Sequence, residues 1–305
     1  MLKKALVTGA SGFLGSIISD SLARSNYQVK TLGKGFKNDF KMDLGNNDSQ
    51  LGIDETFDVV IHAAGKAHMV PKTQSEKQAF YDVNFEGTKR LCSMFEASNN
   101  TPKSFIFIST VAVYGTDTGE LISEDHLLNG NSPYAQSKIF AEEWLQQWSK
   151  ANEVILSILR LPLVVGPNPP GNLGAMISGI RSGKYLSIGD ASAKKSMVLA
   201  EDIAEIIPVL ETTGGTYNLT DGYHPSFGEL ENVIASAMGK NPPLKIPIAI
   251  AKVIALIGNI LGPQFPINTD KLKKITSGLT FDDSKARKML GWQSHPVIKK
   301  IPYIL

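Results

Sequence analysis

Three side chains in this sequence have the types and the order that proton transfer at an alcohol carbon requires. Thr110 follows Ser109, and Tyr134 stands four residues before Lys138, a spacing that places Tyr134 and Lys138 on one face of a helix. A phenol with a pKa of about 10 is a poor base at neutral pH, but a nearby ammonium favours its ionised form. We therefore expect Tyr134 to exchange a proton with a substrate oxygen that the Thr110 hydroxyl also holds.

A glycine-rich string near the start of the chain indicates where a dinucleotide would bind. Gly9, Gly12 and Gly15 follow a short apolar run and precede an amphipathic stretch. The first glycine would permit a tight turn, the second would let the backbone approach a pyrophosphate, and the third would let the helix pack closely. The free N–H groups at the helix N-terminus would then bind the pyrophosphate. Together with Tyr134 and Lys138, this string predicts an oxidoreductase that uses a nicotinamide dinucleotide.

The residues after the second expected strand bear on the choice of cofactor. An NAD enzyme usually places an acidic residue there, against the ribose hydroxyls. Residues 30–35 read KTLGKG instead and contain no acid. Lys34 could pair with a 2′-phosphate or could be a solvated loop lysine. We expect NADP(H) to be slightly favoured over NAD(H), and we expect Asp43 and Leu44 to hold the adenine end.

The elements that must position these residues alternate between strand and helix. Short runs rich in Val, Ile and Phe alternate with amphipathic stretches; the runs lie at 2–7, 28–32, 59–62, 104–109 and 154–160, and the stretches at 14–25, 74–98 and 133–150. This alternation predicts an α/β Rossmann fold, a doubly wound parallel sheet with helices on both faces. Such sheets bind ligands beyond the C-terminal ends of their strands.

The pattern changes after Arg160. Prolines and glycines make residues 162–171 rich in turns, and the expected elements beyond them are helices at 173–183, 200–210, 227–238, 246–261 and 284–290 and a strand at 216–219. We therefore expect a Rossmann domain formed by residues 1–166 plus about 196–222. A smaller, mostly helical substrate-binding domain would comprise residues 167–195 and 223–305.

The composition of the whole chain argues against several classes of function. The net charge is +2 and the lysines are dispersed, so no nucleic-acid partner is expected. We find no apolar run of about 18 uncharged residues and expect no membrane span. The nearest candidate, 246–261, is interrupted by Pro247 and Lys252 and is expected to be a buried or surface-packed helix, with weak contact to a membrane surface as the alternative. The short apolar run after Lys3 and Lys4 fits a first strand better than a secretion signal. With one cysteine and five scattered histidines, we expect no disulfide, no metal site and a cytoplasmic location.

Along nearly its whole length the sequence resembles the extended short-chain dehydrogenase/reductases, in the branch that acts on nucleotide sugars. The matching positions are 8–15, Asp43-Leu44, 62–65, Asn84, Gly87-Thr88, Ser109-Thr110, Tyr114-Gly115, Tyr134, Lys138, 160–162, Gly166-Pro167 and 290–292.

This resemblance implies a catalytic set and a cofactor site. The catalytic set would be Thr110, Tyr134 and Lys138, with Asn84 as part of the framework near them. The residues expected to contact the cofactor lie in the glycine string, after the second expected strand, at the end of the third, and in the catalytic pair: Gly9, Ser11, Gly12, Phe13, Leu14, Gly15, Lys34, Asp43, Leu44, His62, Ala63, Ala64, Tyr134 and Lys138.

The resemblance also implies residues for the substrate. Asn172 stands where relatives bind the substrate diphosphate, and Lys195 stands where relatives often have arginine. A lysine cannot make the bidentate grip of an arginine, which puts the usual pose of a UDP-sugar in doubt. Lys66 and His68 could reach the sugar, and Ser109 is a further substrate candidate. Each of these could instead be an ordinary surface or framework residue.

The residues after Thr110 narrow the reaction. Val111, Ala112 and Val113 offer neither the acidic pair of the 4,6-dehydratases nor the cysteine of the 3,5-epimerases. What remains is hydride transfer at C4 of a nucleotide hexose, most simply a UDP-sugar, by a 4-keto reductase or a 4-epimerase in surface-polysaccharide synthesis.

Other readings of the same residues stay open. One is a reductase of a steroid- or flavonoid-like alcohol, and another is a non-catalytic protein that senses the cofactor. The chain could also form a homodimer through the helices that hold residues 85–95 and 140–148.

Overall fold

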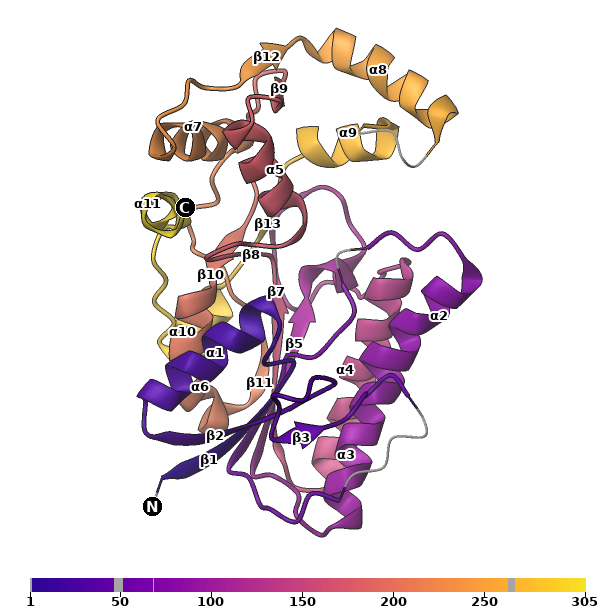
Figure 1. The fold of residues 1–305 in the computed structure, drawn as a ribbon, viewed down its shortest axis with the longest axis vertical. Helices are drawn as coiled ribbons and strands as arrows, with labels where there is room; N and C mark the ends of the chain where they lie inside the picture. Colours follow the sequence, from indigo (N-terminus) through magenta and orange to yellow (C-terminus); the bar gives the residue numbers. More distant parts are fainter. Residues whose placement is uncertain (1, 47–51, 68, 263–266) are drawn as a thin grey trace.

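The computed structural model describes residues 2–46, 52–67, 69–262 and 267–305. Within these residues seven parallel strands form one sheet, in the spatial order β11-β7-β5-β4-β1-β2-β3 (Figure 1). The strands are β1 (Lys3–Thr8), β2 (Tyr27–Gly33), β3 (Phe40–Lys41), β4 (Val59–His62), β5 (Ser104–Thr110), β7 (Ile155–Leu161) and β11 (Gly215–Asn218). The strand order reverses between β1 and β4, which confirms the predicted Rossmann fold and marks the point where such sheets bind ligands.

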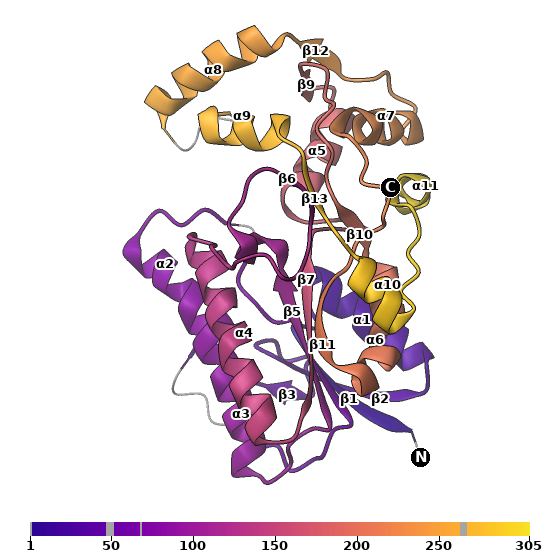
Figure 2. The same ribbon diagram turned by 180° about the vertical axis from the view of Figure 1, so that it is seen from behind.

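Helices cover both faces of this sheet, as Figures 1 and 2 show from opposite sides. One face carries α1 (Phe13–Arg24), α6 (Ala200–Thr213) and α10 (Ser284–Leu290). The other face carries α3 (Gly87–Ala97) and α4 (Pro133–Ala151), and α2 (Gln74–Tyr81) packs against α4.

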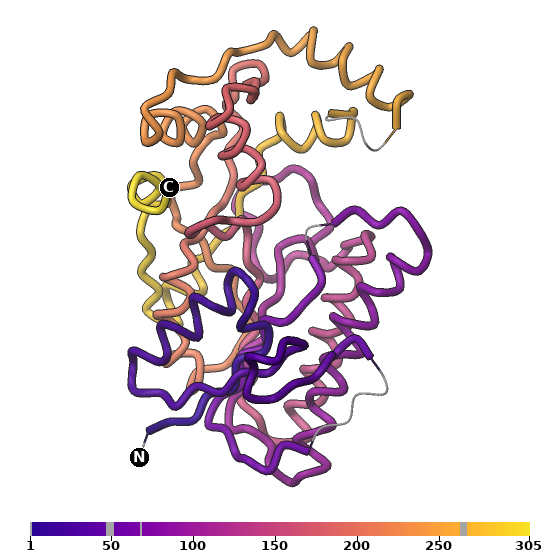
Figure 3. The backbone as a smooth tube through the Cα atoms, viewed as in Figure 1, coloured from indigo at the N-terminus to yellow at the C-terminus, as the bar shows by residue number. Residues whose placement is uncertain are grey.

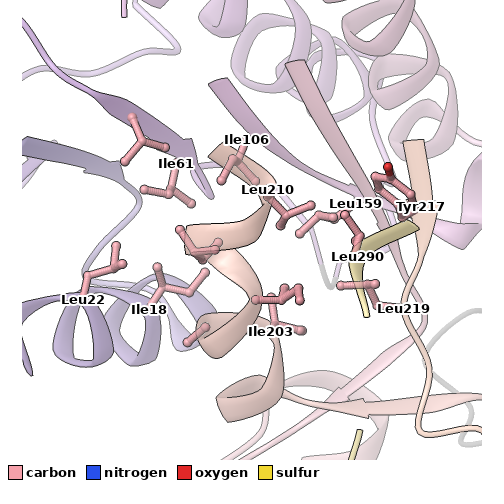
Figure 4. Close-up of a cluster of buried hydrophobic side chains, with 14 of the residues drawn as sticks. Ile18, Leu22, Ile61, Ile106, Leu159, Ile203, Leu210, Tyr217, Leu219 and Leu290 are labelled. Carbon is pink, nitrogen blue, oxygen red and sulfur yellow. The ribbon is translucent and has the colours of Figure 1, made fainter. Parts of the chain in front are cut away.

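The strands alternate their side chains between these two layers. In β5, Ile106 points into the cluster with α1 and α6, whereas Phe105 and Phe107 point into the cluster with α3 and α4. Ile18 of α1 and Ile203 of α6 pack over the first face of the sheet (Figure 4). Each fully buried side chain of this size contributes roughly 1.5–3 kcal/mol, so these clusters hold the strand ends in place.

The remaining elements lie beyond the C-terminal ends of the strands. They include three short parallel pairs, β8 with β10, β9 with β12, and β6 with β13. Their bounds are β6 (Gly119–Ile122), β8 (Leu163–Val165), α5 (Gly171–Arg181), β9 (Leu186–Ile188), β10 (Met197–Leu199), α7 (Phe227–Ala237), β12 (Leu244–Ile246), α8 (Ile248–Leu261), α9 (Thr269–Thr276), β13 (Leu279–Phe281) and α11 (Val297–Ile304). The trace in Figure 3 runs out to this end and returns through β13 to α10 and α11.

Two details differ from the sequence expectations. Residue Ile246 closes strand β12, and the helix begins only at Ile248 because Pro247 takes the extended N-cap position. Leu290 and Trp292 pack into the core beneath the sheet, so this part of the expected segment 223–305 lies with the Rossmann layer. The division of the rest into a separate substrate-binding domain stays a prediction.

Two further expectations concern surfaces. The proposed dimer helices lie near each other as α3 and α4, and Phe140 is 41% exposed with its ring 5.7 Å from that of Phe85. Self-association through them stays a prediction. No described helix is both long and apolar enough to cross a membrane.

Candidate active site

The loop between β1 and α1 has the glycine geometry that a dinucleotide requires. Gly9 has φ +71°, and a Cβ there would lie 2.7 Å from the backbone of Ala64. A Cβ on Gly15 would lie 2.2 Å from the carbonyl oxygen of Gly9, and one on Gly12 would lie 3.2 Å from it. Glycine is therefore required at 9 for the turn and at 15 for close packing of α1 against the loop.

The N-terminus of α1 is open to an anionic ligand. Gly12 is the N-cap, no side chain caps the helix, and its first turn contains no acidic residue. Ser11 and Gly12 are exposed, and Phe13 and Leu14 are half-buried. The uncapped N–H groups and the positive end of the helix dipole fit a pyrophosphate, so these residues could hold the dinucleotide that the sequence predicts.

At the end of β2, Lys34 pairs with Asp43. The Lys34 Nζ lies 3.0 Å from Asp43 Oδ2, while Asp43 Oδ1 accepts a hydrogen bond from the Gly45 N–H. Burial would raise the pKa of Asp43, but Lys34 and the Gly45 N–H outweigh it and hold that pKa below its usual value. The Lys34 side chain is exposed, so a cofactor phosphate could reach it, although its ammonium already has a carboxylate partner in Asp43.

His62, at the end of β4, is the centre of a buried hydrogen-bond chain. The Ala64 N–H donates to Thr8 Oγ1, which lies 2.6 Å from His62 Nδ1. On the other side, His62 Nε2 lies 2.9 Å from Thr88 Oγ1, whose hydroxyl donates to the Asn84 carbonyl. Because Thr88 already donates, it must accept from Nε2–H, and Nδ1 then accepts from Thr8.

This chain makes His62 a positioning residue. Its ring is fully buried, and burial together with Lys138 lowers its pKa to about 3, so it stays neutral. The imidazole therefore cannot touch a bound cofactor directly. It ties β1 and β4 to the helix that begins near Asn84, and it fixes the backbone at Ala63 and Ala64, which are half-buried beside Gly9.

Asn84 joins the β4 loop to the catalytic helix. It lies in a single π-helical turn (Asp82–Glu86) and is fully buried. Its amide accepts from the Lys66 N–H at 2.7 Å and donates to the Lys66 carbonyl at 3.1 Å and to Ser137 Oγ at 3.0 Å. Single π-turns are frequent at functional sites. Here the wider turn accompanies an amide that holds the backbone of Lys66 against α4.

Tyr134 and Lys138 lie in the first turns of helix α4, whose N-terminus is well capped. Ser132 is the N-cap and accepts from the Ala135 N–H, and Pro133 occupies the first helical position. Lys138 is only 4% exposed. Its Nζ donates to the Ile108 carbonyl at 2.8 Å and lies 4.4 Å from the centre of the Phe107 ring. Burial lowers the pKa of Lys138 to about 8, although Glu142 partly opposes this.

Thr110, at the end of β5, contacts Tyr134 at the start of α4. Burial raises the pKa of the Tyr134 phenol, and a hydrogen bond from the Thr110 side chain partly opposes the rise. The Thr110 hydroxyl also accepts from the Ala112 N–H at 3.2 Å. In this structure the phenol therefore keeps its proton near neutral pH, and it needs additional positive charge beside it to ionise there.

Ser109 belongs to a buried ionic network that the sequence did not reveal. Its hydroxyl donates to Glu142, and Arg160 Nη2 binds Glu142 Oε2 at 2.7 Å. Arg160 Nη1 reaches Tyr114 Oη at 3.3 Å, and Tyr114 donates to Asn218 at 2.7 Å. Ser109 is 3% exposed, so its hydroxyl is not available to a substrate as the sequence reading suggested. The spacing of Lys138 and Glu142, four residues apart on α4, was the available signal.

The other expected substrate residues are spread around the same end of the sheet. Lys66 is half-buried with its Nζ 5.9 Å from the centre of the Phe80 ring, and Asn172 is exposed in the first turn of α5. Burial lowers the pKa of the half-buried Lys195, with Asp117 opposing and Lys274 reinforcing the shift. His68 lies outside the described residues. Their contact with substrate stays a prediction.

Metal chemistry has no candidate centre in the part of the chain that the structure describes. No group of three or more His, Cys, Asp or Glu side chains there could hold a metal ion. Cys92, the single cysteine, is fully buried in α3, and burial raises the pKa of its thiol.

Comparisons with known proteins agree with this geometry. Residues 5–219 match the model of the NAD dependent epimerase/dehydratase family. Among curated proteins, the N-acetyl-α-D-glucosaminyl-diphospho-ditrans,octacis-undecaprenol 4-epimerase of Escherichia coli O157:H7 is 27% identical, over 93% of this chain and 89% of its own length. The UDP-glucose 4-epimerase of Vibrio cholerae is also 27% identical, over 96% and 91%.

Solved structures show the same fold at lower identity. RMD from Pseudomonas aeruginosa, in complex with NADPH, superposes with a TM-score of 0.77 at 22% identity, covering 99% of this chain and 95% of that one. The UDP-glucose 4-epimerase of Bifidobacterium longum, with NAD⁺ and UDP, gives a TM-score of 0.73 at 22% identity, covering 98% and 96%.

Proposed function

The chain belongs to the NAD-dependent epimerase/dehydratase family, and we propose that it transfers a hydride at C4 of a hexose carried on a nucleoside diphosphate. One observation carries the proposal. Thr110 at the end of β5 contacts Tyr134 at the start of α4, one helical turn before Lys138, at the sheet edge that also carries the glycine loop after β1. A proton-transfer group and a dinucleotide cradle thus share the edge where such sheets bind ligands.

Each residue of the site has a separate proposed role in the reaction. When bound, the nicotinamide supplies or accepts the hydride. Tyr134 gives its phenolic proton to the oxygen on C4 during reduction, or takes that proton during oxidation. Thr110, already hydrogen-bonded to Tyr134, holds the same oxygen. Lys138 lies one helical turn after Tyr134 and donates to the Ile108 carbonyl, and its proposed role is to supply positive charge that lowers the cost of ionising the phenol when the site is occupied.

The segment after Thr110 supports simple hydride transfer. Val111–Tyr114 forms a 3₁₀ turn in which Val113 and Tyr114 are buried and no carboxylate is present. An elimination would need an acid or base at this position. The chemistry that these residues support is therefore addition or removal of hydride at one carbon.

A 4-keto reductase is the first form of this activity, and a 4-epimerase is the second. The reductase is supported by the exposed Lys34 and by the absence of an acid from residues 30–35 at the end of β2, where the nearest carboxylate to Lys34 is that of Asp43 from further along the chain. The epimerase is supported by two relatives that are named 4-epimerases. In either form we propose a UDP-hexose as substrate and a role in the synthesis of surface polysaccharide.

Turnover with defined sugars separates these forms. The protein is incubated with UDP-hexoses, UDP-4-keto-hexoses and a hexosamine on undecaprenyl diphosphate, while the absorbance of reduced nicotinamide is followed and products are identified by NMR. Net consumption of reduced cofactor with a 4-keto sugar indicates the reductase. Interconversion of two hexoses without net consumption indicates the epimerase. No change in any sugar, with cofactor bound, contradicts the proposal.

The choice of cofactor depends on Lys34. We propose that Lys34 pairs with the 2′-phosphate of NADP(H), and we expect Lys34→Ala to weaken NADPH binding about tenfold with little effect on NADH, since one charge-assisted hydrogen bond is lost. Titration of cofactor fluorescence measures both constants. Lys37→Ala, an exposed lysine in the same loop, is the control. Tighter binding of NADH than NADPH, unchanged by Lys34→Ala, would overturn this role.

A further inference from the structure

Helix α8 turns its large apolar side chains away from the protein. The residues that it buries are small: Ala251, Ala255 and Gly258. The exposed residues are large, and Val253 and Leu256 are each 58% exposed and Ile260 is 86% exposed. The exposed apolar residues of α8, here called the α8 face, are Ile248, Ile250, Val253, Leu256, Ile257, Ile260 and Leu261.

The α8 face is continuous and uncharged. Val253, Leu256, Ile257 and Ile260 follow the i, i+3, i+4, i+7 spacing of one helical face. Within α8, Lys252 is the only charged residue, and Asn259 is bonded to Thr269 at the start of α9. A helix in a water-exposed position usually shows the opposite arrangement, with large apolar residues inward. Continuous exposed apolar patches on single chains mark interaction sites.

The position of α8 leaves this face accessible to a large, flat partner. Figures 1 and 2 show α8 along the edge of the molecule furthest from the N-terminus, with α9 between it and the sheet. Leu244 of β12 is 77% exposed and lies three residues before Pro247, the N-cap of α8. It extends the apolar surface. The C-terminal edge of the sheet, near which α4 and its Tyr134 begin, lies on the inner side of this same end of the molecule.

Charge around the α8 face is positive, although the whole chain is nearly neutral. Residues 240–276, which span β12, α8 and α9, contain six lysines against one acidic residue, Asp270, whereas residues 1–239 contain twenty Lys and Arg against twenty-six Asp and Glu. Lys245 in β12 and Lys252 in α8 are exposed beside the apolar residues. An apolar surface flanked by lysines complements the acyl chains and anionic headgroups of a bilayer.

A second copy of this chain fits the same face less well. An isologous contact through α8 would bring the same surface of two copies together, and Lys245 and Lys252 would then approach their own counterparts. No acidic residue lies between 240 and 269, and Asp190, which follows the partner strand of β12 and interacts with Lys245, offsets only part of this charge. The charge pattern therefore favours an anionic partner.

We propose that the α8 face docks on the anionic surface of a lipid bilayer, with α8 lying in the plane of the interface. Its 14 residues make a helix about 21 Å long, shorter than the hydrocarbon core of about 30 Å. The lysines would contact headgroups while Val253, Leu256 and Ile260 enter the acyl boundary. This proposal does not depend on the proposed reaction, because binding to vesicles is measured without substrate.

Sedimentation with vesicles tests the docking. The full chain is mixed with vesicles of phosphatidylethanolamine and phosphatidylglycerol, and separately with phosphatidylcholine vesicles. We expect binding to the anionic vesicles that weakens as salt is raised, and weaker binding to phosphatidylcholine. Ile260→Glu and Val253→Glu should each reduce partitioning about tenfold, and Lys252→Gln should reduce binding to the anionic vesicles only.

A matched control separates the α8 face from exposed apolar residues in general. Leu2→Glu makes the same change of charge at a residue 59% exposed at the opposite end of the molecule, and it should bind vesicles like the wild type. Melting curves verify that each variant is folded. The proposal is overturned if the wild type does not sediment with anionic vesicles, or if Ile260→Glu, Val253→Glu and Leu2→Glu bind alike. A dimer that Ile260→Glu dissociates, without vesicle binding by the wild type, would instead assign the face to a second copy.

Discussion

The Lys138 ammonium is enclosed by protein, with the Ile108 carbonyl and the Phe107 ring as its nearest partners. Burial of a cation in this way disfavours its charged form, and the pKa of Lys138 falls to about 8. The folded protein therefore carries an energetic cost near neutral pH at the residue that its reaction needs. Such conflicts between stability and activity are common at active sites.

Lys138→Met should remove this cost from the free energy of unfolding. In the wild type, Lys138 loses its proton at a lower pH in the folded state than in the unfolded state, so the free energy of unfolding rises between about pH 8 and 10.5. The variant lacks this rise, and at pH 7 its free energy of unfolding should exceed that of the wild type by about 1–2 kcal/mol. The gain is smaller than the full cost of burying the ammonium, because the Ile108 carbonyl loses its hydrogen-bond donor.

Urea unfolding of both proteins from pH 7 to 9.5 measures the difference. Lys150→Met, on the exposed end of the same helix, is the control and should follow the wild type. Parallel curves for the wild type and Lys138→Met across this range would show that the ammonium is not destabilised by burial.

Tyr134→Phe tests the proton transfer itself. Removing the hydroxyl takes away the acid or base but keeps the ring, so kcat should fall roughly 10²–10⁴-fold while the melting temperature changes little. Tyr81→Phe removes a phenol that bonds Gln136 on the same helix, and it should keep most of the activity. Equal turnover by the wild type and Tyr134→Phe would rule out the assigned role.

At this scale, the sequence predicted the local arrangement of the candidate catalytic residues but not the surroundings of every candidate, and their catalytic roles stay a prediction. The four-residue spacing of Tyr134 and Lys138 predicts a shared helical face, and the structure has it in α4. The burial of His62 and Ser109 could not be foreseen, because Thr88 and Glu142, which hold them, lie 26 and 33 residues away. Only the folded arrangement shows that these two side chains position others.

At the scale of elements, the turn from β1 into α1 depends on two separate constraints at Gly9. Its φ of +71° is unfavourable for other residues, and its Cβ position is occupied by the Ala64 backbone. Gly183 has nearly the same φ, +70°, with no atom within 4 Å of a Cβ. The pair therefore distinguishes the cost of backbone conformation from that of steric overlap.

Substituting alanine at each position should give unequal losses. Gly183→Ala should cost about 1 kcal/mol of unfolding free energy and leave cofactor affinity unchanged. Gly9→Ala should cost more, about 2–4 kcal/mol, and should also weaken dinucleotide binding, because the loop must move away from Ala64. Thermal unfolding and cofactor titration measure both effects. Equal losses at the two positions would mean that β1 and β4 do not approach closely at this loop.

The elements that the sequence predicted best are those with long periodic patterns. The buried strands β1, β4, β5 and β7 and the helices beside them lie where the apolar runs placed them. The pairs β6 with β13 and β9 with β12 escaped prediction. Each strand has three or four residues, too short for a period to emerge, and its partner lies far along the chain.

At the scale of the whole molecule, two surfaces occupy the same end of the structure. The strand ends gather the glycine loop and the catalytic residues, and the elements beyond them carry the α8 face outward (Figure 1). The net charge of +2 concealed this organisation, because the acidic first 239 residues nearly cancel the basic remainder. The net charge alone therefore gives no indication of the surface interaction that the distribution of charge favours.

Transfer of a labelled hydride tests the central claim most directly. The protein is given a UDP-4-keto-hexose and reduced nicotinamide cofactor that carries deuterium at C4 of its ring, and the sugar product is examined by NMR. The account predicts a hexose with deuterium at C4, formed by the wild type and lost in Tyr134→Phe. A product labelled at another carbon, or deuterium transfer that proceeds unchanged in Tyr134→Phe, would contradict it.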